Sequence, residues 1–266
     1  HEALQGTVDN ILRDPVVGPR LKAWFRESTI TTRDGKTPLV VFHGTSAEKD
    51  FDAFDPTAVR EHSLSEGFGA HFGTLPAASR FLWMPPDDAV NAAVFPRAAN
   101  ASGARVIPAF VRLENPVYLP DLGGWEPGDV IAALRGEKAS GTDMHAFGLE
   151  LEVLVDDGLM SLSQMEKSLA KFDEQVEVLK RAGIDEFAEL IEEELFHHAL
   201  DVTRLNMTDA QRAAAVEATK ALHAKIHRFL ESAGFDGARY RAMPESGQHI
   251  GEAGVHDAFV IFKPQQ

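Results

Sequence analysis

Three runs of hydrophobic residues predict β-strands, two in the first half of the chain and one at its end. Pro38–His43 is a short apolar run that we expect to form a buried strand ending at Gly44. Residues 106–119 are rich in β-type side chains, and their prolines indicate an edge, a bulge or a bend. Ala258–Phe262 predicts a strong last strand, with a shorter one just before it at Ala238–Tyr240.

Helical spacing of apolar residues dominates the start and the middle of the chain. Residues 1–30 contain two apolar stripes, and we expect a break between them at Pro19. In the middle, Gly183 suits a helix end, and Thr208 with Gln211 forms a capping box that opens a helix stopping before Gly234. The inward residues expected of the two preceding helices are Leu162, Met165, Leu169, Phe172, Val176 and Leu179, then Phe187, Leu190, Ile191 and Leu195.

These patterns predict an α+β protein whose strands lie on either side of a helical block. We divide the chain into an N-terminal helical segment, 1–30, the first part of an α+β domain, 31–139, a helical insertion, 140–233, and the last part of the domain, 234–266. The insertion has three open interpretations: a lid, a regulatory subdomain, or a surface that recognises an acceptor or partner. We favour the last.

Composition narrows the classes of function. The chain has 266 residues and a formal net charge of −15, which argues against a general nucleic-acid binder but leaves a local basic groove open. It has no cysteine, so thiol chemistry is excluded. No apolar run approaches the roughly 20 residues of a membrane span, and the first ten residues lack the features of a signal peptide. We therefore expect a soluble protein of unassigned location, with secretion or injection into a host cell left open.

Two pairs of histidines raise the question of a metal site. His223 and His227 are four residues apart on a predicted helix, so both could face one ion, but no suitably spaced third ligand is evident. His197 and His198 are adjacent and point in different directions on a helix. We expect no metal and interpret these residues as part of packed or solvated helix faces.

Three short segments carry the residues with chemical potential. The first is Phe42–Ser46, with His43 at a strand end before Gly44, Thr45 and Ser46. The second is Gly67–Thr74, with His71 and Phe72 before a helix that we expect to run from Leu75 to about Trp83. The third places His256 and Asp257 at the start of the last strand. Taken singly, each segment is also typical of an ordinary turn beside a strand.

In this order, the three segments resemble the ADP-ribosyltransferases of the His-Tyr-Glu type, the group of poly-ADP-ribose polymerases and diphtheria-type toxins. The likeness is closest to the ADP-ribosyltransferase-like domains of phage polyvalent proteins and of bacterial toxins and effectors. It rests on LVVFHGTS followed by FDAFDP, on GFGAHFGT, and on GFDGARY followed by DAFVIFKPQQ. It covers roughly residues 20–120 and 233–266. The resemblance implies a split, mostly antiparallel β core around an NAD cleft, into which the helical subdomain is inserted.

The resemblance also assigns roles to residues. His43 would hydrogen-bond the adenosine-side ribose, Gly44 would contact the nicotinamide carboxamide through its backbone, and Thr45 would assist. His71 stands where the family has tyrosine and, with Phe72, would stack on nicotinamide. Asp257 stands where the family has glutamate, so the carboxylate that would hold the nicotinamide-side ribose reaches one methylene less far. Alternative carboxylates, just upstream of it, are Glu245 and Glu252.

The function that the resemblance implies is mono-ADP-ribosyl transfer. NAD would be a substrate, nicotinamide would be released, and the ADP-ribose would pass to a macromolecule, with protein favoured over nucleic acid as the acceptor. Breaking the glycosidic bond develops positive charge on the ribose, which a fixed carboxylate stabilises, and it needs neither metal nor thiol. The alternatives are an NAD glycohydrolase, with water as acceptor, and a catalytically degenerate binding or virion structural module.

Overall fold

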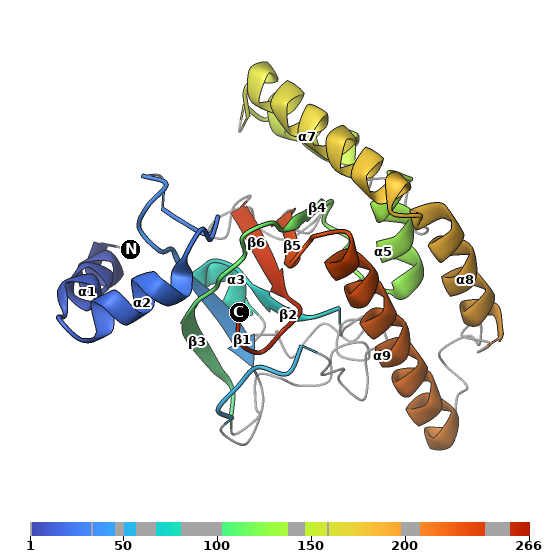
Figure 1. The fold of residues 1–266 in the computed structure, drawn as a ribbon, viewed down its shortest axis with the longest axis horizontal. Coiled ribbons are helices and arrows are strands. Elements are labelled where there is room, and N and C mark those ends of the chain that lie inside the picture. The colour runs from blue at the N-terminus through green and yellow to red at the C-terminus, as the bar shows by residue number, and fades with distance from the viewer. Residues whose placement is uncertain are drawn as a thin grey trace, which may run out of the picture.

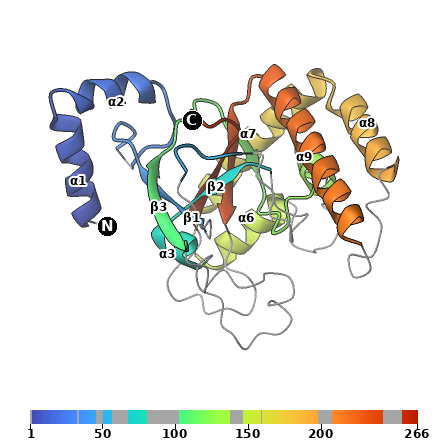
Figure 2. The ribbon, with the colours of Figure 1, turned by 90° about the horizontal axis from the view of Figure 1, so that it is seen from below.

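The chain forms a central β-structure with helices on both sides (Figure 1). The structure is a computed structural model that describes residues 2–32, 34–45, 51–56, 68–80, 103–137, 147–158, 160–197, 208–242 and 256–266. Helices α1 (Glu2–Arg13) and α2 (Val17–Phe25) lie at one end, and α8 (Ile184–His197) and α9 (Asp209–Ser232) lie at the other, with the strands between them (Figure 2). The predicted α+β class is therefore confirmed.

The strands form two sheets, and an isolated β-bridge joins them. Strand β1 (Val40–Thr45) pairs with β3 (Arg105–Phe110), and the second sheet has the order β2-β6-β5-β4. Its strands are β2 (Ala70–Phe72), β6 (His256–Ile261), β5 (Gly237–Ala242) and β4 (Val117–Leu119). All the pairings are antiparallel except that of β4 with β5. Between β1 and β2, the backbones of Phe42 and Gly73 exchange two hydrogen bonds of 2.9 Å.

The two faces of the second sheet are covered by different groups of residues. Residues opposite each other in an antiparallel pair share a face, and successive residues of a strand alternate between faces. One face carries Phe72, Phe259 and Ile261, which pack with Ile30, Val41, Val111 and Leu113. The other face carries Ala238 and Val260, which pack against α5, α8 and α9.

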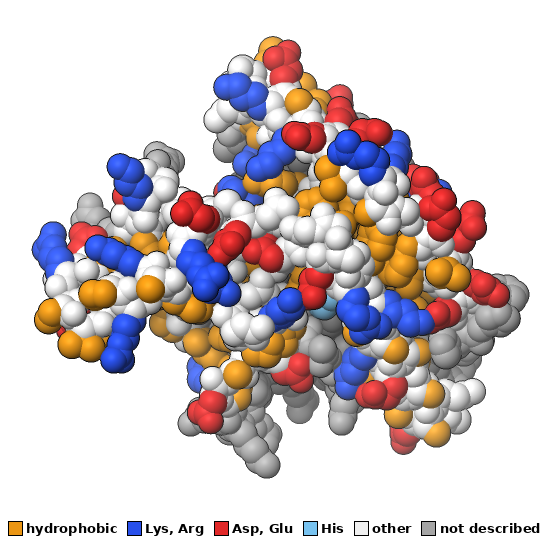
Figure 3. Space-filling view, in the orientation of Figure 1, with side chains coloured by type: hydrophobic (Ala, Val, Ile, Leu, Met, Phe, Trp, Pro, Cys, Tyr) orange, Lys and Arg blue, Asp and Glu red, His pale blue; other side chains and the backbone are white. Residues whose placement is uncertain are grey.

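The helical block packs directly on this second face. It contains α6 (Phe147–Asp156), α7 (Leu162–Arg181), α8 (Ile184–His197) and α9 (Asp209–Ser232). A further helix that the sequence analysis did not predict, α5 (Pro127–Leu134), precedes the block and packs with it. Leu134, Leu179, Ile191 and Leu222 belong to one buried cluster that also contains Val260 of β6. The outer side of α8 carries acidic side chains toward solvent (Figure 3), among them Asp185, Glu186, Glu189 and Glu193.

The predicted capping box at Thr208 is confirmed, because its side chain accepts from Gln211 N–H and the Gln211 side chain bonds back. Gly183 and Gly234 follow helix ends with φ of +86° and +93°, which glycine adopts without steric cost. In α7 the predicted stripe divides, since Met165 and Leu169 pack on α6 whereas Leu179 joins the main cluster. The predicted helix ends at Thr208, Gly183 and Gly234 are confirmed because each depends only on residues that are close in the sequence.

Four details of the predicted elements are wrong. Leu162 is 63% exposed and does not belong to the inward stripe of α7. Leu190 is 58% exposed, and the inward stripe of α8 is Ile184, Ala188 and Ile191. The break between α1 (Glu2–Arg13) and α2 (Val17–Phe25) lies at residues 14–16 and not at Pro19. Pro19 falls within the first turn of α2, where a residue without a backbone N–H is tolerated. Strand β1 continues to Thr45 instead of ending at Gly44, because it pairs with β3 as far as Arg105.

Candidate functional site

His43 lies where β1 and β2 diverge. After the Phe42–Gly73 bridge the backbones separate, and His43 Nδ1 takes over the contact by donating to the carbonyl oxygen of His71 at 2.7 Å. A carbonyl only accepts, so Nδ1 carries the proton, and in the neutral ring Nε2 is then an acceptor. Two of the predicted site residues, His43 and His71, are therefore in contact. The contact joins the side chain of His43 to the main chain of His71.

Aromatic rings fix the orientation of the His43 imidazole. Phe54 meets it edge-on with 5.0 Å between ring centroids, and Phe72 lies at 5.5 Å. The two phenylalanines also contact each other at 4.9 Å.

Gly44 is inside the β1–β3 ladder, opposite Val106, and Thr45 is buried at the end of that strand. A small helix, α3 (Leu75–Arg80), follows β2 with a hydrogen bond from Ala77 N–H to the Thr74 hydroxyl.

The side chain of His71 projects from one face of the second sheet, and that of the next residue, Phe72, projects from the opposite face. His71 is opposite Val260 in the register, whereas Phe72 is opposite Phe259. Its Nδ1 lies 3.1 Å from the hydroxyl of Tyr240, and its ring meets Trp125 edge-on at 4.9 Å. Burial, helped by the neighbouring His43, lowers the pKa of His71 to about 3, so the ring is neutral. Burial likewise raises the pKa of Tyr240.

Asp257 lies on the face of Phe72 and Phe259, opposite the face of the His71 side chain. It is paired with Arg241 across the β5–β6 ladder, two residues before Phe259. One carboxylate oxygen accepts from Arg239 Nη2 at 2.7 Å, and the other lies 3.8 Å from Arg241 Nε. Burial alone would lower the pKa of Arg239, but Asp257 and Tyr118 together outweigh burial and the net shift is upward. The carboxylate is therefore bound to two cations.

The sequence analysis missed several residues around these positions. Trp125 and Tyr240 form an aromatic cluster with His71, and their rings meet at 4.8 Å. His256 approaches Gly73 so closely that a Cβ there would lie 3.2 Å from its Nε2. GFDGARY contains Tyr240 and Arg239, but only the register of β5 shows that they serve opposite faces. No local pattern marked Trp125.

The two histidines of α9 each direct one ring nitrogen at a backbone carbonyl. His223 Nε2 lies 2.9 Å from the carbonyl oxygen of Trp125, and His227 Nε2 lies 2.9 Å from that of Phe68. Both residues are buried, so the packed interpretation is right and the solvated one is wrong. Within the described ranges no three His, Asp or Glu side chains gather as a metal site would require. His198, Glu245, Glu252 and Ser46 lie outside the described residues.

Comparison of the chain with known protein families, with curated proteins and with solved structures finds no match. Among the helices that the structure describes, none has the length and apolar character needed to cross a membrane.

Proposed function

We propose that this chain binds NAD and transfers its ADP-ribose to a macromolecular acceptor. The proposal rests on the resemblance of its three segments to the His-Tyr-Glu ADP-ribosyltransferases. The observation that best supports it is the His43 imidazole, which is held by the His71 carbonyl at the point where the two sheets separate. This hydrogen bond fixes the orientation of the His43 ring, as positioning a ribose would require.

The proposed reaction breaks the bond between the nicotinamide nitrogen and ribose C1′. The bonding electron pair leaves with nicotinamide, and a nucleophile of the acceptor forms the new bond to C1′ and loses its proton. His43 positions the ribose, and Asp257 stabilises the positive charge that develops on it. A carboxylate already bound by Arg239 and Arg241 exerts a weaker negative field, so we expect slow transfer.

A second candidate is a binding or virion structural module that retains the NAD fold without catalysis. The pairing of Asp257 with two guanidinium groups specifically favours it, because their positive charge opposes a ribosyl cation. The two candidates differ in whether nicotinamide is released.

Incubation with NAD labelled in its adenosine half and a cell lysate tests both candidates. The proteins to compare are the parent, His43→Ala, Asp257→Ala and, as a control, Asp173→Ala, which removes an exposed carboxylate of α7. Labelled macromolecules that depend on His43 and Asp257, but not on Asp173, support transfer. Nicotinamide release without labelling identifies a hydrolase. NAD-dependent thermal stabilisation without release supports the module, and absence of stabilisation, release and labelling overturns the proposal.

A further inference from the structure

Strand β4 is an edge strand that α7 covers through one side chain. The amide of Gln175 pairs with the backbone of Tyr118 on both sides: its Oε1 accepts from the N–H at 2.6 Å, and its Nε2 donates to the carbonyl at 2.9 Å. Gln175 is 5% exposed, so this pairing is inside the protein. It holds the helix in place against the strand and brings Lys171, one turn earlier in α7, to the Tyr118 side chain.

Two cations lie against that side chain. The Lys171 ammonium donates to the Tyr118 hydroxyl at 2.8 Å and lies 4.2 Å from the ring centroid. The Arg239 guanidinium lies 5.7 Å from the same centroid and 5.8 Å from that of Phe259. Both cations therefore lie around one aromatic ring, and each has more N–H groups than the contacts described here use.

A third cation continues this cluster along β5. Arg241 lies on the same face as Arg239, two residues later, and both guanidinium groups approach the Asp257 carboxylate. Lys171, Arg239, Arg241 and Asp257 together carry three positive charges and one negative charge. We call these four residues with Tyr118 the β5 cationic cluster. Arg239, Arg241 and Asp257 are 26%, 33% and 36% exposed in their side chains, so solvent reaches them.

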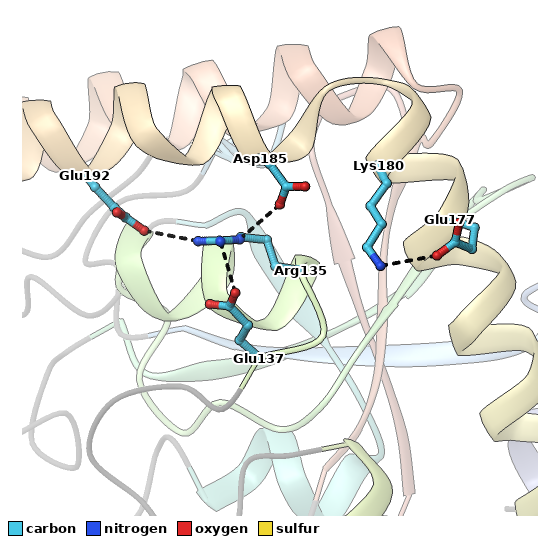
Figure 4. Close-up of polar contacts among 6 residues, drawn as sticks. All are labelled: Arg135, Glu137, Glu177, Lys180, Asp185 and Glu192. Carbon is cyan, nitrogen blue, oxygen red and sulfur yellow. Dashed lines mark hydrogen bonds and ion pairs between the residues drawn. The ribbon is translucent and has the colours of Figure 1, made fainter.

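Two other basic residues, Arg135 and Lys180, lie beside carboxylates without a second cation. Arg135 lies among three carboxylates, those of Glu137, Asp185 and Glu192, at 3.0–3.4 Å (Figure 4). In the same figure Lys180 contacts Glu177 at 3.2 Å, three residues away on α7. The β5 cationic cluster therefore has a local excess of two positive charges, whereas the whole chain has a formal net charge of −15.

We infer that the β5 cationic cluster is a binding site for a phosphate group. Two guanidinium groups that share one carboxylate have more N–H donors than it can accept, and a phosphate oxygen is the acceptor that matches their fork geometry. The lysine adds a point charge from α7. Because the His71 side chain lies on the opposite face, the site is distinct from the aromatic cluster of His71, Trp125 and Tyr240, and it does not depend on NAD turnover.

Calorimetric titration of the full chain with inorganic pyrophosphate at low salt tests this site. Arg241→Gln and Lys171→Gln are the informative variants, since each leaves the Arg239–Asp257 pair intact. We expect each to weaken binding by about tenfold, the effect of losing one charge-assisted hydrogen bond. Asp257→Asn removes the competing carboxylate and should strengthen binding. Lys180→Gln, on the same helix and with the same loss of charge, should leave binding unchanged.

Two results would overturn the inference. One is no binding of pyrophosphate by the parent protein, and the other is an equal loss of affinity in Lys180→Gln and Arg241→Gln, which would indicate general charge attraction. A second titration in the presence of ADP-ribose identifies the source of the phosphate. Competition assigns it to the dinucleotide, and additive binding assigns it to a separate phosphate-bearing ligand. Failure of NAD cleavage leaves these titrations unaffected.

Discussion

The buried imidazole of His227 makes the stability of this protein sensitive to mild acid. The side chain is 6% exposed, stacks on Phe262 with 4.1 Å between ring centroids, and donates from Nε2 to the carbonyl of Phe68. Burial lowers its pKa from 6.5 to about 4, although the bond to Phe68 and the nearby Glu231 partly oppose that shift. The segment that it holds leads directly into β2 and His71.

The sign of the effect follows from where the proton binds. Between pH 6.5 and about 4, the unfolded chain protonates His227 whereas the folded chain does not. Unfolding therefore takes up a proton, and the free energy of unfolding decreases as the pH falls through this window. At pH 5, which is 1.5 units below the unfolded pKa, the loss from this residue is about 2 kcal/mol, and it reaches about 3 kcal/mol near pH 4.

Urea denaturation of the parent and of His227→Gln, followed by circular dichroism at pH 7.5 and pH 5, measures this loss. Glutamine keeps an N–H donor for the Phe68 carbonyl but does not titrate. We expect the variant to lose about 2 kcal/mol less than the parent between the two pH values. Other groups, including His71, contribute equally to both proteins. Equal losses in parent and variant would refute the assignment of a depressed pKa to His227.

Three further predictions concern the residues that shape the sheet. Gln175→Ala should lower the free energy of unfolding by roughly 2–4 kcal/mol in urea denaturation, because it leaves two edge groups of β4 unpaired; a loss below 1 kcal/mol, roughly the net value of one hydrogen bond, would contradict this. Gly69→Ala should cost roughly 2–5 kcal/mol, since φ is +136° and the new Cβ would lie 2.5 Å from a β6 carbonyl oxygen. Gly35→Ala, with φ of +68° and open space, is its control and should cost only about 1 kcal/mol. Tyr240→Phe should cost about 1 kcal/mol and shift the ¹⁵N resonance of His71 Nδ1, and an unmoved resonance would exclude their hydrogen bond.

The candidate site was predictable only in part. The sequence indicated that His43 and His71 lie near each other, and their contact is present, although it joins a side chain to a backbone carbonyl. It also placed Asp257 at the start of the last strand, where the structure has it. The face on which a strand residue projects depends on register, and a shift of one residue reverses it. The pairing of Asp257 with Arg239 and the separation of its side chain from that of His71 were therefore beyond sequence reasoning.

The sequence by itself determined the class of the protein, the positions of its main helices and strands, and the ends marked by Thr208, Gly183 and Gly234, because these depend on side-chain periodicity and backbone preferences within a few residues. Tertiary structure alone decided which strands pair and which side of α8 is buried. It also decided that the histidines of α9 bond to distant carbonyls and that Arg239 and Arg241 share one carboxylate. Those arrangements depend on contacts between segments far apart in the chain, for which no local pattern carries a signal.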